Sequence, residues 1–540
     1  MSVKYATDPI FEELSWEIHN DRCVGLVGIN GSGKSTLLHL IDGSLKSETG
    51  FINLASGLKV GVLQQEPQLT PGNSVIQEAL SASPELKEVE KALAKVENRL
   101  GLEEVYGDEK TLTRAIAEQE KYLKKFEALG GNNYESRVRS TLLGMGIKEE
   151  EFELDVDSLS GGQKKLVGLA KLLVTQPDLL LLDEPDNHLD LAGKTFLEKF
   201  IRNFKGGVVI ISHDRYLLDV VADEIAELEN GKITVYKGNY SEYSFEKEVR
   251  LIRQQEVFQA QQKEITRLET SAKRLLTWGH IHDNEKFVKR GKNILKRIDR
   301  IERIDKPITD RRKMDLSIAG WRGSNKVLEF EKISKSFEMQ NGENRKILDG
   351  IDFDLWHGER VGLVGPNGAG KSVLFQLILG KLLAEGGEIK IGPSIKTGYY
   401  AQEHETLDYS STLIETIRQA APLTEEKAVS FLGKFLFSYE QDRGPVSNLS
   451  GGERSRLQMA LLMLTGVNFL LLDEPTNNLD IASAEELEEA LEEFEGSVLV
   501  ISHDRYFLDR VVGRIIELDQ GKVKNYLGGF SDYLEEKNRK

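Results

Sequence analysis

Gly28-Ile29-Asn30-Gly31-Ser32-Gly33-Lys34-Ser35-Thr36 is the stretch of sequence that decides the fold. It follows a short apolar run, Cys23 to Val27, and precedes a leucine-rich segment at residues 37–40, so a buried strand, a glycine-rich loop and a helix come in the order of a phosphate-binding loop. The glycines let backbone N–H groups converge on phosphate oxygens at a helix N-terminus. Lys34 is placed to reach the β and γ phosphates of a nucleotide, and the Ser35 hydroxyl to bind Mg²⁺. The stretch therefore predicts an α/β domain that binds a nucleotide.

Two further motifs in the first half of the chain specify the kind of nucleotide-binding domain. Leu179-Leu180-Leu181-Leu182-Asp183-Glu184-Pro185 is typical of a buried strand that ends in two adjacent carboxylates. Asp183 suits the binding of a metal ion, and Glu184 suits the orientation or deprotonation of an attacking water molecule. Leu159-Ser160-Gly161-Gly162-Gln163 comes before this strand, and a helix-like sequence follows it. By itself, Ser160 could equally be an ordinary helix cap.

Together these motifs resemble the ATP-binding-cassette superfamily, in which the LSGGQ signature loop closes over an ATP molecule held by a different cassette. The resemblance implies roles for four more residues. Gln65 matches the glutamine that contacts Mg²⁺ and water, and His213 matches the histidine that touches the γ-phosphate. Asp190 matches the loop that communicates between paired cassettes, and Tyr5 stands where cassettes place an aromatic ring against adenine. Outside this context, Gln65 would be a polar loop residue and His213 a structural histidine.

The second half of the chain repeats the motifs in the same order. The repeated loop is Gly365, Pro366, Asn367, Gly368, Ala369, Gly370, Lys371, Ser372 and Val373, and Gln402 matches Gln65. The repeated signature is Ser450, Gly451, Gly452 and Glu453, and it is followed by Asp473, Glu474, Asp480 and His503. Phe337 stands in the position of Tyr5. In both copies the loop lysine and the glutamine are 31 residues apart, the signature serine and the aspartate 23, and the aspartate and the histidine 30. The chain therefore contains two cassettes in tandem.

The first cassette carries an insertion. The offset between the copies falls from 337 to 290 residues, so the first copy has 47 additional residues between its glutamine and its signature. They fall in a helix-like region at about residues 81–131, where residues 85–127 contain 11 acidic and 9 basic side chains. This balance predicts a solvated helix pair without a preference for RNA.

Two cassettes in one chain can build both ATP sites internally by pairing head to tail. One site is expected to combine Lys34, Ser35, Gln65, Asp183, Glu184 and His213 with Ser450 and Gly452. The other is expected to combine Lys371, Ser372, Gln402, Asp473, Glu474 and His503 with Ser160 and Gly162. In each site the glutamate and the histidine are the expected catalytic residues, and the serine, glutamine and aspartate are the expected Mg²⁺ ligands. Because ATP lies between the halves, its binding closes them and its hydrolysis opens them.

The two expected sites are not identical. Val373 stands where the first loop has Thr36, so the second site lacks a hydroxyl that could help to hold a phosphate. Asp186 follows the first Asp-Glu-Pro, whereas Thr476 follows the second. We expect two unequal sites that are both active.

Residues 245–325, between the two cassettes, read as an antiparallel helical hairpin. The first helix is indicated by a heptad pattern of Leu251, Phe258, Ile265 and Ala272 with Leu268 and Leu275. The second helix is indicated by Ile294, Ile298, Ile301, Ile304 and Ile308, and the expected turn is Trp278-Gly279-His280-Ile281-His282-Asp283-Asn284. A first arm of about 30 residues would be roughly 45 Å long.

The hairpin is basic and the rest of the chain is acidic. Residues 263–313 contain 16 Lys and Arg against 8 Asp and Glu, a surplus of eight positive charges, while the whole chain carries −17 and the remainder therefore about −25. This distribution favours a polyphosphate partner at the hairpin and repels it elsewhere. On charge alone, a solvated helix face is the plainer interpretation.

Composition limits the remaining possibilities. The 540 residues are enough for several domains, and 39% hydrophobic residues suffice for a core in each. No apolar run approaches the roughly 18 residues of a membrane span, and the N-terminus has no signal pattern. We therefore expect a cytoplasmic protein without a membrane partner. The single cysteine, Cys23, lies in an apolar strand pattern, which excludes an internal disulfide and a cysteine metal cluster.

Twin cassettes joined by a basic hairpin, without a membrane segment, resemble the ABC-F family of ribosome-associated ATPases. Gly238-Asn239-Tyr240-Ser241-Glu242-Tyr243 and Gly528-Gly529-Phe530-Ser531-Asp532-Tyr533 extend the resemblance over nearly the whole chain. It implies that the hairpin is a P-site tRNA interaction motif that enters the ribosomal E site, with tRNA and rRNA as partners. The candidates for RNA contact are Lys273, Arg274, Trp278, His280, His282, Lys286, Lys289, Arg290 and Lys292. Trp278 could instead pack the end of the hairpin.

The sequence thus predicts two P-loop ATP-binding cassettes, residues 1–244 and 326–540, joined by the hairpin, in a monomer that hydrolyses ATP with Mg²⁺ as it engages ribosomes. Two other classes stay open. A transporter motor with separate membrane subunits predicts co-purification with membranes, and a DNA-repair cassette protein predicts a preference for duplex DNA over ribosomes at controlled salt. The hairpin tip does not distinguish housekeeping translation, rescue of stalled ribosomes and protection against antibiotics.

Overall fold

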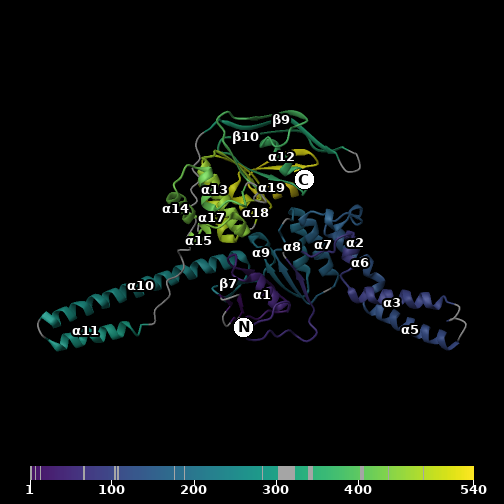
Figure 1. Ribbon diagram of the computed structural model, residues 1–540, viewed down its shortest axis with the longest axis horizontal. Helices are drawn as coiled ribbons and strands as arrows, with labels where there is room; N and C mark the ends of the chain where they lie inside the picture. Colours follow the sequence, from purple (N-terminus) through teal and green to yellow (C-terminus); the bar gives the residue numbers. More distant parts are fainter. Residues whose placement is uncertain are drawn as a thin grey trace. The chain divides into compact units, whose positions relative to one another are not determined.

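The computed structural model (Figure 1) describes residues 3–5, 8–11, 14–64, 67–102, 105, 109–175, 177–187, 189–281, 284–301, 323–338, 344–401, 407–435, 437–477 and 479–539. They form two compact units. One unit comprises Met1–Tyr240 and Asp315–Lys540 and contains both cassettes, and the other comprises Ser241–Met314. The fold class is the predicted one, an α/β tandem of two cassettes with a long α-helical insertion between them.

The first cassette is built on a six-stranded sheet in the order β4-β5-β6-β3-β7-β8, parallel except for β8. Its elements are β1 (Val3–Tyr5), β2 (Asp8–Phe11), β3 (Cys23–Val27), α1 (Lys34–Ile41), β4 (Val60–Leu63), α2 (Val75–Leu80), α3 (Pro84–Leu100), α5 (Glu109–Ala128), α6 (Tyr134–Gly144), α7 (Gly161–Val174), β5 (Leu179–Asp183), α8 (Leu191–Asn203), β6 (Gly207–Ile211), α9 (Arg215–Val221), β7 (Glu224–Glu229) and β8 (Lys232–Lys237). All five residues of β5 are buried, because helices cover both faces of a parallel sheet and select a continuous apolar strand.

The second cassette repeats this sheet in the order β13-β14-β15-β11-β16-β17. Its elements are β9 (Lys326–Glu338), β10 (Asn344–Trp356), β11 (Arg360–Val364), α12 (Lys371–Ile378), β12 (Gly386–Ile391), β13 (Thr397–Tyr400), α13 (Leu413–Ala420), α14 (Glu425–Lys434), α15 (Tyr439–Asp442), α16 (Gly451–Thr465), β14 (Phe469–Asp473), α17 (Ile481–Glu493), β15 (Ser497–Ile501), α18 (Arg505–Val511), β16 (Arg514–Asp519), β17 (Lys522–Leu527) and α19 (Phe530–Asn538). An antiparallel sheet, β10-β9-β12, packs its apolar side into the same core as β11 and α12.

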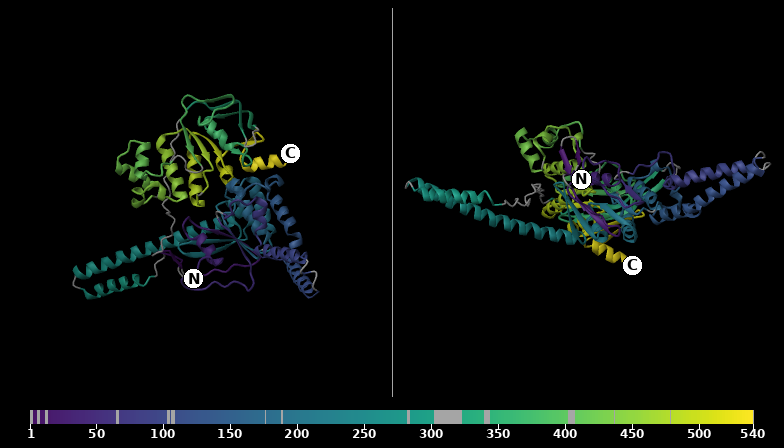
Figure 2. Two further views of the ribbon diagram at one scale, coloured as in Figure 1. Left: turned by 45° about the vertical axis from the view of Figure 1, so that its right-hand side comes forward. Right: turned by 90° about the horizontal axis from the view of Figure 1, so that it is seen from below.

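The insertion in the first cassette forms a pair of helices. α3 and α5 lie side by side and project from the cassette (Figure 2). An ion pair between Arg99 and Glu118 (3.1 Å) joins them, and Leu86, Val89 and Leu93 of α3 are buried. The 47 additional residues therefore occupy this pair, for which the described part of the second cassette has no counterpart between α13 and α14.

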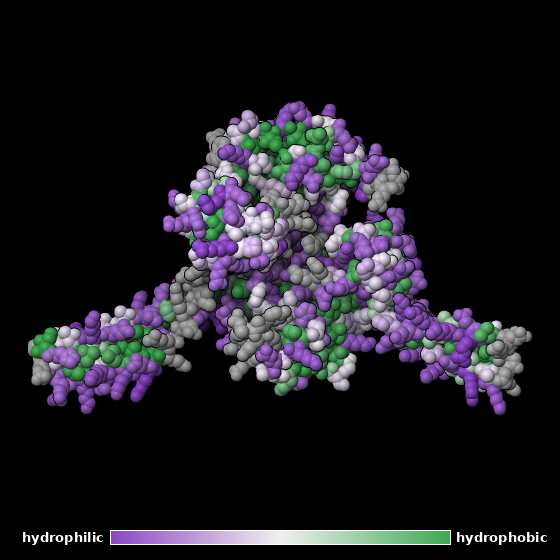
Figure 3. All heavy atoms as spheres, viewed as in Figure 1, coloured by the Kyte–Doolittle hydropathy of each residue, from purple (hydrophilic) through white to green (hydrophobic). Residues whose placement is uncertain are grey.

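The Ser241–Met314 unit contains a helical hairpin of α10 (Tyr240–Ile281) and α11 (Glu285–Ile298). Ile265, Ala272 and Gly279 are buried at the predicted heptad spacing along α10. Hydrophilic side chains line the outer edges of the hairpin, and a hydrophobic band runs between its helices (Figure 3).

The boundaries within the hairpin differ from the prediction. Trp278, His280 and Ile281 lie in the last turn of α10, which is 42 residues long, because none of them breaks a helix by itself. The turn is therefore shorter than expected, and Asn284 begins α11 by capping it, with its side chain accepting from Lys286 N at 3.1 Å. Ile304 and Ile308 of the expected second helix lie outside the described residues.

None of the helices in the described part of the chain combines the length with the apolar composition needed to span a lipid bilayer.

Candidate functional site

Both glycine-rich loops are held against a neighbouring strand. The backbone φ of Gly28 is +158° and that of Gly365 is +154°, and a Cβ atom at these positions would lie 2.5 Å from the Leu228 carbonyl oxygen and 2.1 Å from the Leu518 carbonyl oxygen. No side chain fits there. Gly33 and Gly370 then begin α1 and α12 in the left-handed conformation, so that the N–H groups of the loop face one concave space.

The two loop lysines fold back over their own loops. Lys34 Nζ donates to the carbonyl oxygens of Gly28 (2.7 Å) and Ile29 (3.1 Å), and Lys371 makes the matching contacts with Gly365 (2.7 Å) and Pro366 (3.2 Å). Burial lowers the pKa of both lysines, although nearby carboxylates oppose the shift. An arriving anion would replace these carbonyl contacts. Its negative charge would offset the free-energy cost of burying the ammonium group.

Asp183 and Glu184 end β5, and Asp473 and Glu474 end β14. Both glutamates have a left-handed backbone, with φ of +47° for Glu184 and +48° for Glu474. Their backbone N–H groups donate to the carbonyl oxygens of the last residues of β6 and β15, at 2.9 Å in each case. The turn therefore places each glutamate close to the phosphate-binding loop of its own cassette, where Lys34 and Lys371 act to lower the pKa of Glu184 and Glu474.

Each glutamate lies next to the predicted histidine of its own cassette. Glu184 Oε1 is 3.6 Å from His213 Nε2, and Glu474 Oε1 is 3.6 Å from His503 Nε2. Burial raises the pKa of Glu184, but His213 and nearby lysines outweigh it and leave that pKa below its ordinary value. In the second cassette burial prevails and raises the pKa of Glu474 to about 7. The two glutamates therefore differ in their electrostatic surroundings.

The signature serines begin helices. Ser160 Oγ accepts from Gln163 N (3.3 Å) at the start of α7, and Gln163 Oε1 accepts from Ser160 N (3.1 Å). Ser450 and Glu453 form the same reciprocal capping box at the start of α16. The helix-cap interpretation of Ser160 is therefore correct for this structure. It is compatible with phosphate binding, since a helix N-terminus favours an anion.

The two cassettes contact one another reciprocally through the residues predicted to communicate between them. Asp190 and Asp480 cap α8 and α17, and each also reaches the phosphate-binding loop of the other cassette. Asp480 Oδ2 accepts from Asn30 N at 3.3 Å, and Asp190 Oδ2 accepts from Asn367 N at 3.3 Å. Loops of one cassette therefore face the nucleotide loop of the other at both ends of the interface.

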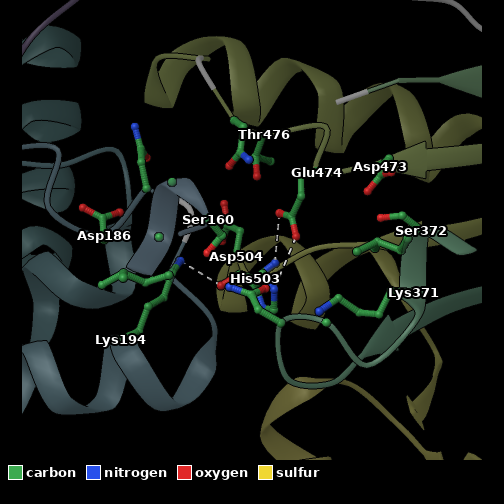
Figure 4. Close-up of a pocket in the computed structure, with 18 of the residues that line it drawn as sticks. Ser160, Asp186, Lys194, Lys371, Ser372, Asp473, Glu474, Thr476, His503 and Asp504 are labelled. Carbon is green, nitrogen blue, oxygen red and sulfur yellow. Dashed lines mark hydrogen bonds and ion pairs between the residues drawn. The ribbon is translucent and has the colours of Figure 1, made fainter. Parts of the chain in front are cut away.

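A cavity of about 930 Å³ lies along this interface. Its lining brings Ser160, Gly161 and Gly162 of the first cassette together with Lys371 and other loop residues of the second (Figure 4). The second-cassette residues in the lining include Phe337, Asn367, Gly368, Gly370, Lys371, Ser372, Val373, Asp473, Glu474 and His503, and the lining also reaches Gly451 and Arg454 of α16. The lining thus brings together the residues expected for one composite site except Gln402, which lies outside the described residues.

The remaining predicted residues are the adenine-stacking rings, the glutamines and the RNA-contact candidates, and some of them are not described. Phe337 lies on β9, is 38% exposed and lines the cavity, with Lys335 Nζ 5.5 Å from the centre of its ring. Tyr5 belongs to β1, but its side chain is not among those described. Gln65, Gln402 and His282 lie outside the described residues. The other RNA-contact candidates are exposed on the hairpin, and Trp278 is 55% exposed.

Sequence reasoning missed a set of charged residues at the interface. Arg215 pairs with Glu488, and Arg505 Nη1 pairs with Glu198 Oε1 at 2.8 Å, so each cassette donates one arginine and one glutamate. Arg215 and Arg505 each come two residues after the histidine of their cassette. The two arginines are 290 residues apart, and so are Glu198 and Glu488. The recurrence of both an arginine and a glutamate at that offset is the signal in the sequence that points to them.

Comparison with known proteins assigns the chain to a family. A family model described as "ABC transporter" matches residues 11–187 and 348–477, and a second model with the same description matches residues 226–318. The chain is 36% identical to the ATP-binding protein YdiF of Bacillus subtilis, over 99% of this chain and 82% of that protein. It is 35% identical to the energy-dependent translational throttle protein EttA of Escherichia coli K12, over 98% of this chain and 93% of that protein.

A plant relative and two solved structures extend the likeness. The chain is 33% identical to ABC transporter F family member 5 of Arabidopsis thaliana, over 97% of this chain and 75% of that protein. A chain in the crystal structure of archaeal ribosomal stalk protein aP1 with archaeal ribosome recycling factor aABCE1 superposes with a TM-score of 0.60 at 19% identity, over 99% and 92% of the two chains. The structure of RNase-L Inhibitor superposes with a TM-score of 0.58 at 19% identity, over 96% of this chain and 89% of that chain. These two structures share the twin-cassette fold.

With its repeated cassette motifs and relatives of more than 30% identity along almost its entire length, the chain belongs to the ABC-F family and is an ATP hydrolase.

Proposed function

We propose that the chain binds two ATP molecules between its cassettes and uses their binding and hydrolysis to control its attachment to the ribosome. The observation that carries the ATP part is the reciprocal contact of Asn30 with Asp480 and of Asn367 with Asp190, at 3.3 Å each. These contacts bring the loops of one cassette to the nucleotide site of the other. A nucleotide there would be held from both sides, so its binding stabilises the closed pair.

The residues at the ends of β5 and α1 suit a Mg²⁺ ion. Asp183 Oδ1 is buried and makes no hydrogen bond with the described residues, and Asp183 also interacts with Ser35 at the start of α1. A buried carboxylate oxygen without a donor favours a cation. The described residues contain no group of three His, Cys, Asp or Glu side chains that could hold a metal alone. This agrees with a Mg²⁺ ion that takes most of its ligands from phosphate and water and stabilises charge on the transferred phosphate.

In this proposal the glutamate of each cassette acts on the attacking water. Glu184 and Glu474 are held in place by their strained turns and lie beside His213 and His503. The loop lysine binds phosphate, the histidine positions the γ-phosphate, and the signature serine of the opposite cassette closes the site. Loss of the γ-phosphate removes contacts that only the closed state makes, and the cassettes separate.

The ribosome part rests on the hairpin. Lys273, Lys286 and Lys289 are exposed on a segment whose net charge is opposite to that of the rest of the chain. One relative is named a translational throttle, which relates that protein to translation. We propose that the ATP-bound monomer docks with its hairpin against tRNA and rRNA, where the cations neutralise phosphates and Trp278 stacks on a base.

Replacing Glu184 and Glu474 with Gln tests the proposal. Hydrolysis should stop while ATP still binds, so the variant should accumulate on ribosomes in ATP and co-sediment with them far more than the unaltered protein. Adding Lys34→Ala and Lys371→Ala, which weaken phosphate binding, is the matched control and should return the variant to the supernatant. Sedimentation that is the same with and without ATP would contradict the proposal.

Charge reversal of the hairpin tests the docking step separately. Lys286→Glu with Lys289→Glu should abolish co-sedimentation of the trapped variant and leave ATP hydrolysis without ribosomes unchanged. Lys121→Glu with Lys124→Glu, on α5 of the other unit, changes the net charge equally and should have a smaller effect. Equal effects of the two pairs would show that only net charge matters.

A further inference from the structure

A lysine of the first cassette lies buried at the junction with the second. Lys194, on α8, is 7% exposed, and its Nζ donates to Asp214 Oδ2 at 2.7 Å and to the backbone carbonyl oxygen of His503 at 2.9 Å. Asp214 belongs to the same cassette as Lys194, whereas His503 belongs to the other. Burial lowers the pKa of Lys194, but Asp214, Asp186 and Asp504 outweigh it and keep that pKa above its ordinary value. The side chain is therefore a cation that bridges the cassettes.

Among the residues that the structure describes, this bridge has no counterpart on the other side of the interface. At the offset of 290 residues Lys194 corresponds to Ala484, and the nearby Asp186 corresponds to Thr476. The aspartate and the lysine are therefore present together in the first copy and absent together from the second. Because Ala484 has no donor, the carbonyl oxygen of His213 cannot receive the equivalent contact from the second cassette.

The contact reaches the chemistry of one site. Figure 4 shows Lys194 approaching from the first cassette toward His503, which faces Glu474 of the second. His503 N donates to Glu474 Oε2 at 3.3 Å, and His503 Nε2 lies 3.6 Å from Glu474 Oε1. Lys194 thus fixes the carbonyl group of the residue whose N–H group and ring both lie against the glutamate. A charge-assisted hydrogen bond of this kind restrains the backbone more strongly than a neutral one.

We propose that Lys194 is a positioning residue, acting in trans, for the ATP site that contains Lys371, Glu474 and Ser160, and that the opposite site has no such residue. When the cassettes close, Lys194 fixes the loop of His503 and with it the orientation of Glu474. When they separate, Lys194 keeps Asp214 and releases His503, so the support exists only in the closed state. The proposal rests on the assignment of the two composite ATP sites made above.

The test measures ATP hydrolysis without ribosomes in two backgrounds. Glu184→Gln leaves hydrolysis to the site that contains Glu474, and Glu474→Gln leaves it to the other site. Into each background we would introduce the pair Asp186→Thr and Lys194→Ala, which installs the residues of the second copy and removes the cation and an acid together. Turnover should fall about tenfold in the Glu184→Gln background, the effect of losing one charge-assisted contact in the transition state. Lys194→Met alone, which leaves Asp186 next to Glu184 unchanged, should alter turnover less than twofold in the Glu474→Gln background.

Substitutions at Lys194 alone separate positioning from packing. Lys194→Arg retains a cation and should keep turnover within about threefold in the Glu184→Gln background, whereas Lys194→Met retains the volume and should lose as much as the pair. These two variants also decide the question if the pair fails to fold. Equal losses in both backgrounds, or equal turnover of the Arg and Met variants, would overturn the proposal. The proposal would also be overturned if the Glu184→Gln and Glu474→Gln proteins were both inactive, because Lys194 could then not act on one site alone. Failure of ribosome binding would leave these results unaffected.

Discussion

A single residue in each cassette has a strained backbone at the candidate site. Glu184 and Glu474 have positive φ, a conformation that costs a residue with a side chain about 1 kcal/mol or more. The hydrogen bonds of their N–H groups to β6 and β15 hold them there. The sheet therefore stabilises a backbone that the local sequence would avoid, and the result is a carboxylate directed at the nucleotide loop.

Gly365 should tolerate no side chain. In Gly365→Ala the new Cβ atom would lie 2.1 Å from the Leu518 carbonyl oxygen, so the loop must move, and we expect a loss of about 2 kcal/mol in the free energy of unfolding together with weaker ATP binding. Calorimetry of unfolding and of ATP binding measures both. Gly433→Ala, on α14 with no atom within 4 Å of its Cβ, is the control and should raise stability by up to about 1 kcal/mol.

Because of Asp504, the cassettes should be more stable at mildly acidic pH than at neutral pH. Burial and Asp214 raise the pKa of Asp504 from 3.8 to about 6, against the opposing effects of Arg215 and Lys194. The folded state therefore holds this proton more tightly than the unfolded state. The group destabilises the fold above about pH 6, and this contribution disappears as the pH falls toward 3.8.

Asp504→Asn removes the titration and keeps the helix cap, since the Asn side chain can accept from Phe507 N as Asp504 does at 3.0 Å. The variant should be more stable than the parent at pH 7, by on the order of 2 kcal/mol, and the difference should vanish near pH 4. Denaturant titrations at both values measure it. A difference that is the same at pH 4 and pH 7 would show that the pKa of Asp504 is not raised.

At the scale of elements, several helix ends serve packing and function together. Asp190 and Asp480 each satisfy the first turn of a helix with one oxygen, and with the other they accept from a loop of the opposite cassette. In the hairpin, Gly291 of α11 brings two helices into close contact. A Cβ atom there would lie 2.8 Å from Leu276 Cγ and 3.2 Å from the Ala272 carbonyl oxygen.

Gly291→Val should loosen the hairpin. The added side chain must push α11 away from α10, so amides of α11 should lose at least tenfold in protection from hydrogen exchange. Asn293→Val places the same β-branched residue at an exposed position of the same helix and controls for helix propensity. Equal loss of protection in the two variants would mean that helix propensity, and not contact between the helices, sets the stability of the hairpin.

At the scale of the whole cassette pair, charged contacts across the interface follow the repeat. Arg215 binds Glu488, which is fully buried, and Arg505 binds Glu198, whose side chain is 12% exposed. The rings of Tyr216 and Tyr506 meet edge to face between them at 6.3 Å. These pairs link the ends of the two histidine loops, so separation of the cassettes must break both.

Glu488→Gln should impair closure more than Glu198→Gln. The first change removes the buried partner of Arg215, leaves it only the more distant Glu485 at 3.6 Å, and also removes a partner of Arg510, which should weaken the closed pair by about 3 kcal/mol. The second affects a pair whose glutamate is 12% exposed, and Arg505 keeps its hydrogen bond to Thr195 Oγ1 (3.4 Å), so the loss should be smaller, about 2 kcal/mol. ATP-dependent energy transfer between labels on the two cassettes measures closure. Glu135→Gln, in an exposed pair on α6, is the control and should have no effect.

The sequence by itself determined the tandem of two cassettes and the helical insertion, because these depend on short motifs and local periodicity. Each half contains a glycine loop between a strand and a helix, a signature segment and a buried strand that ends in Asp-Glu, and this combination in this order indicates a cassette. The spacing of the repeats added the position of the insertion. Helix ends in the hairpin were placed less well, because Trp278 and its neighbours fit a turn and a helix terminus equally.

Only the tertiary structure decided which charges meet across the interface. Lys194 and His503 are 309 residues apart, and nothing in the sequence near either residue indicates the other. The opposite pKa shifts of Glu184 and Glu474 likewise follow from how deeply each is buried and which cations surround it. Burial and the partners of a charge are properties of packing between distant segments, so the asymmetry of the two ATP sites became specific only when the chain was folded.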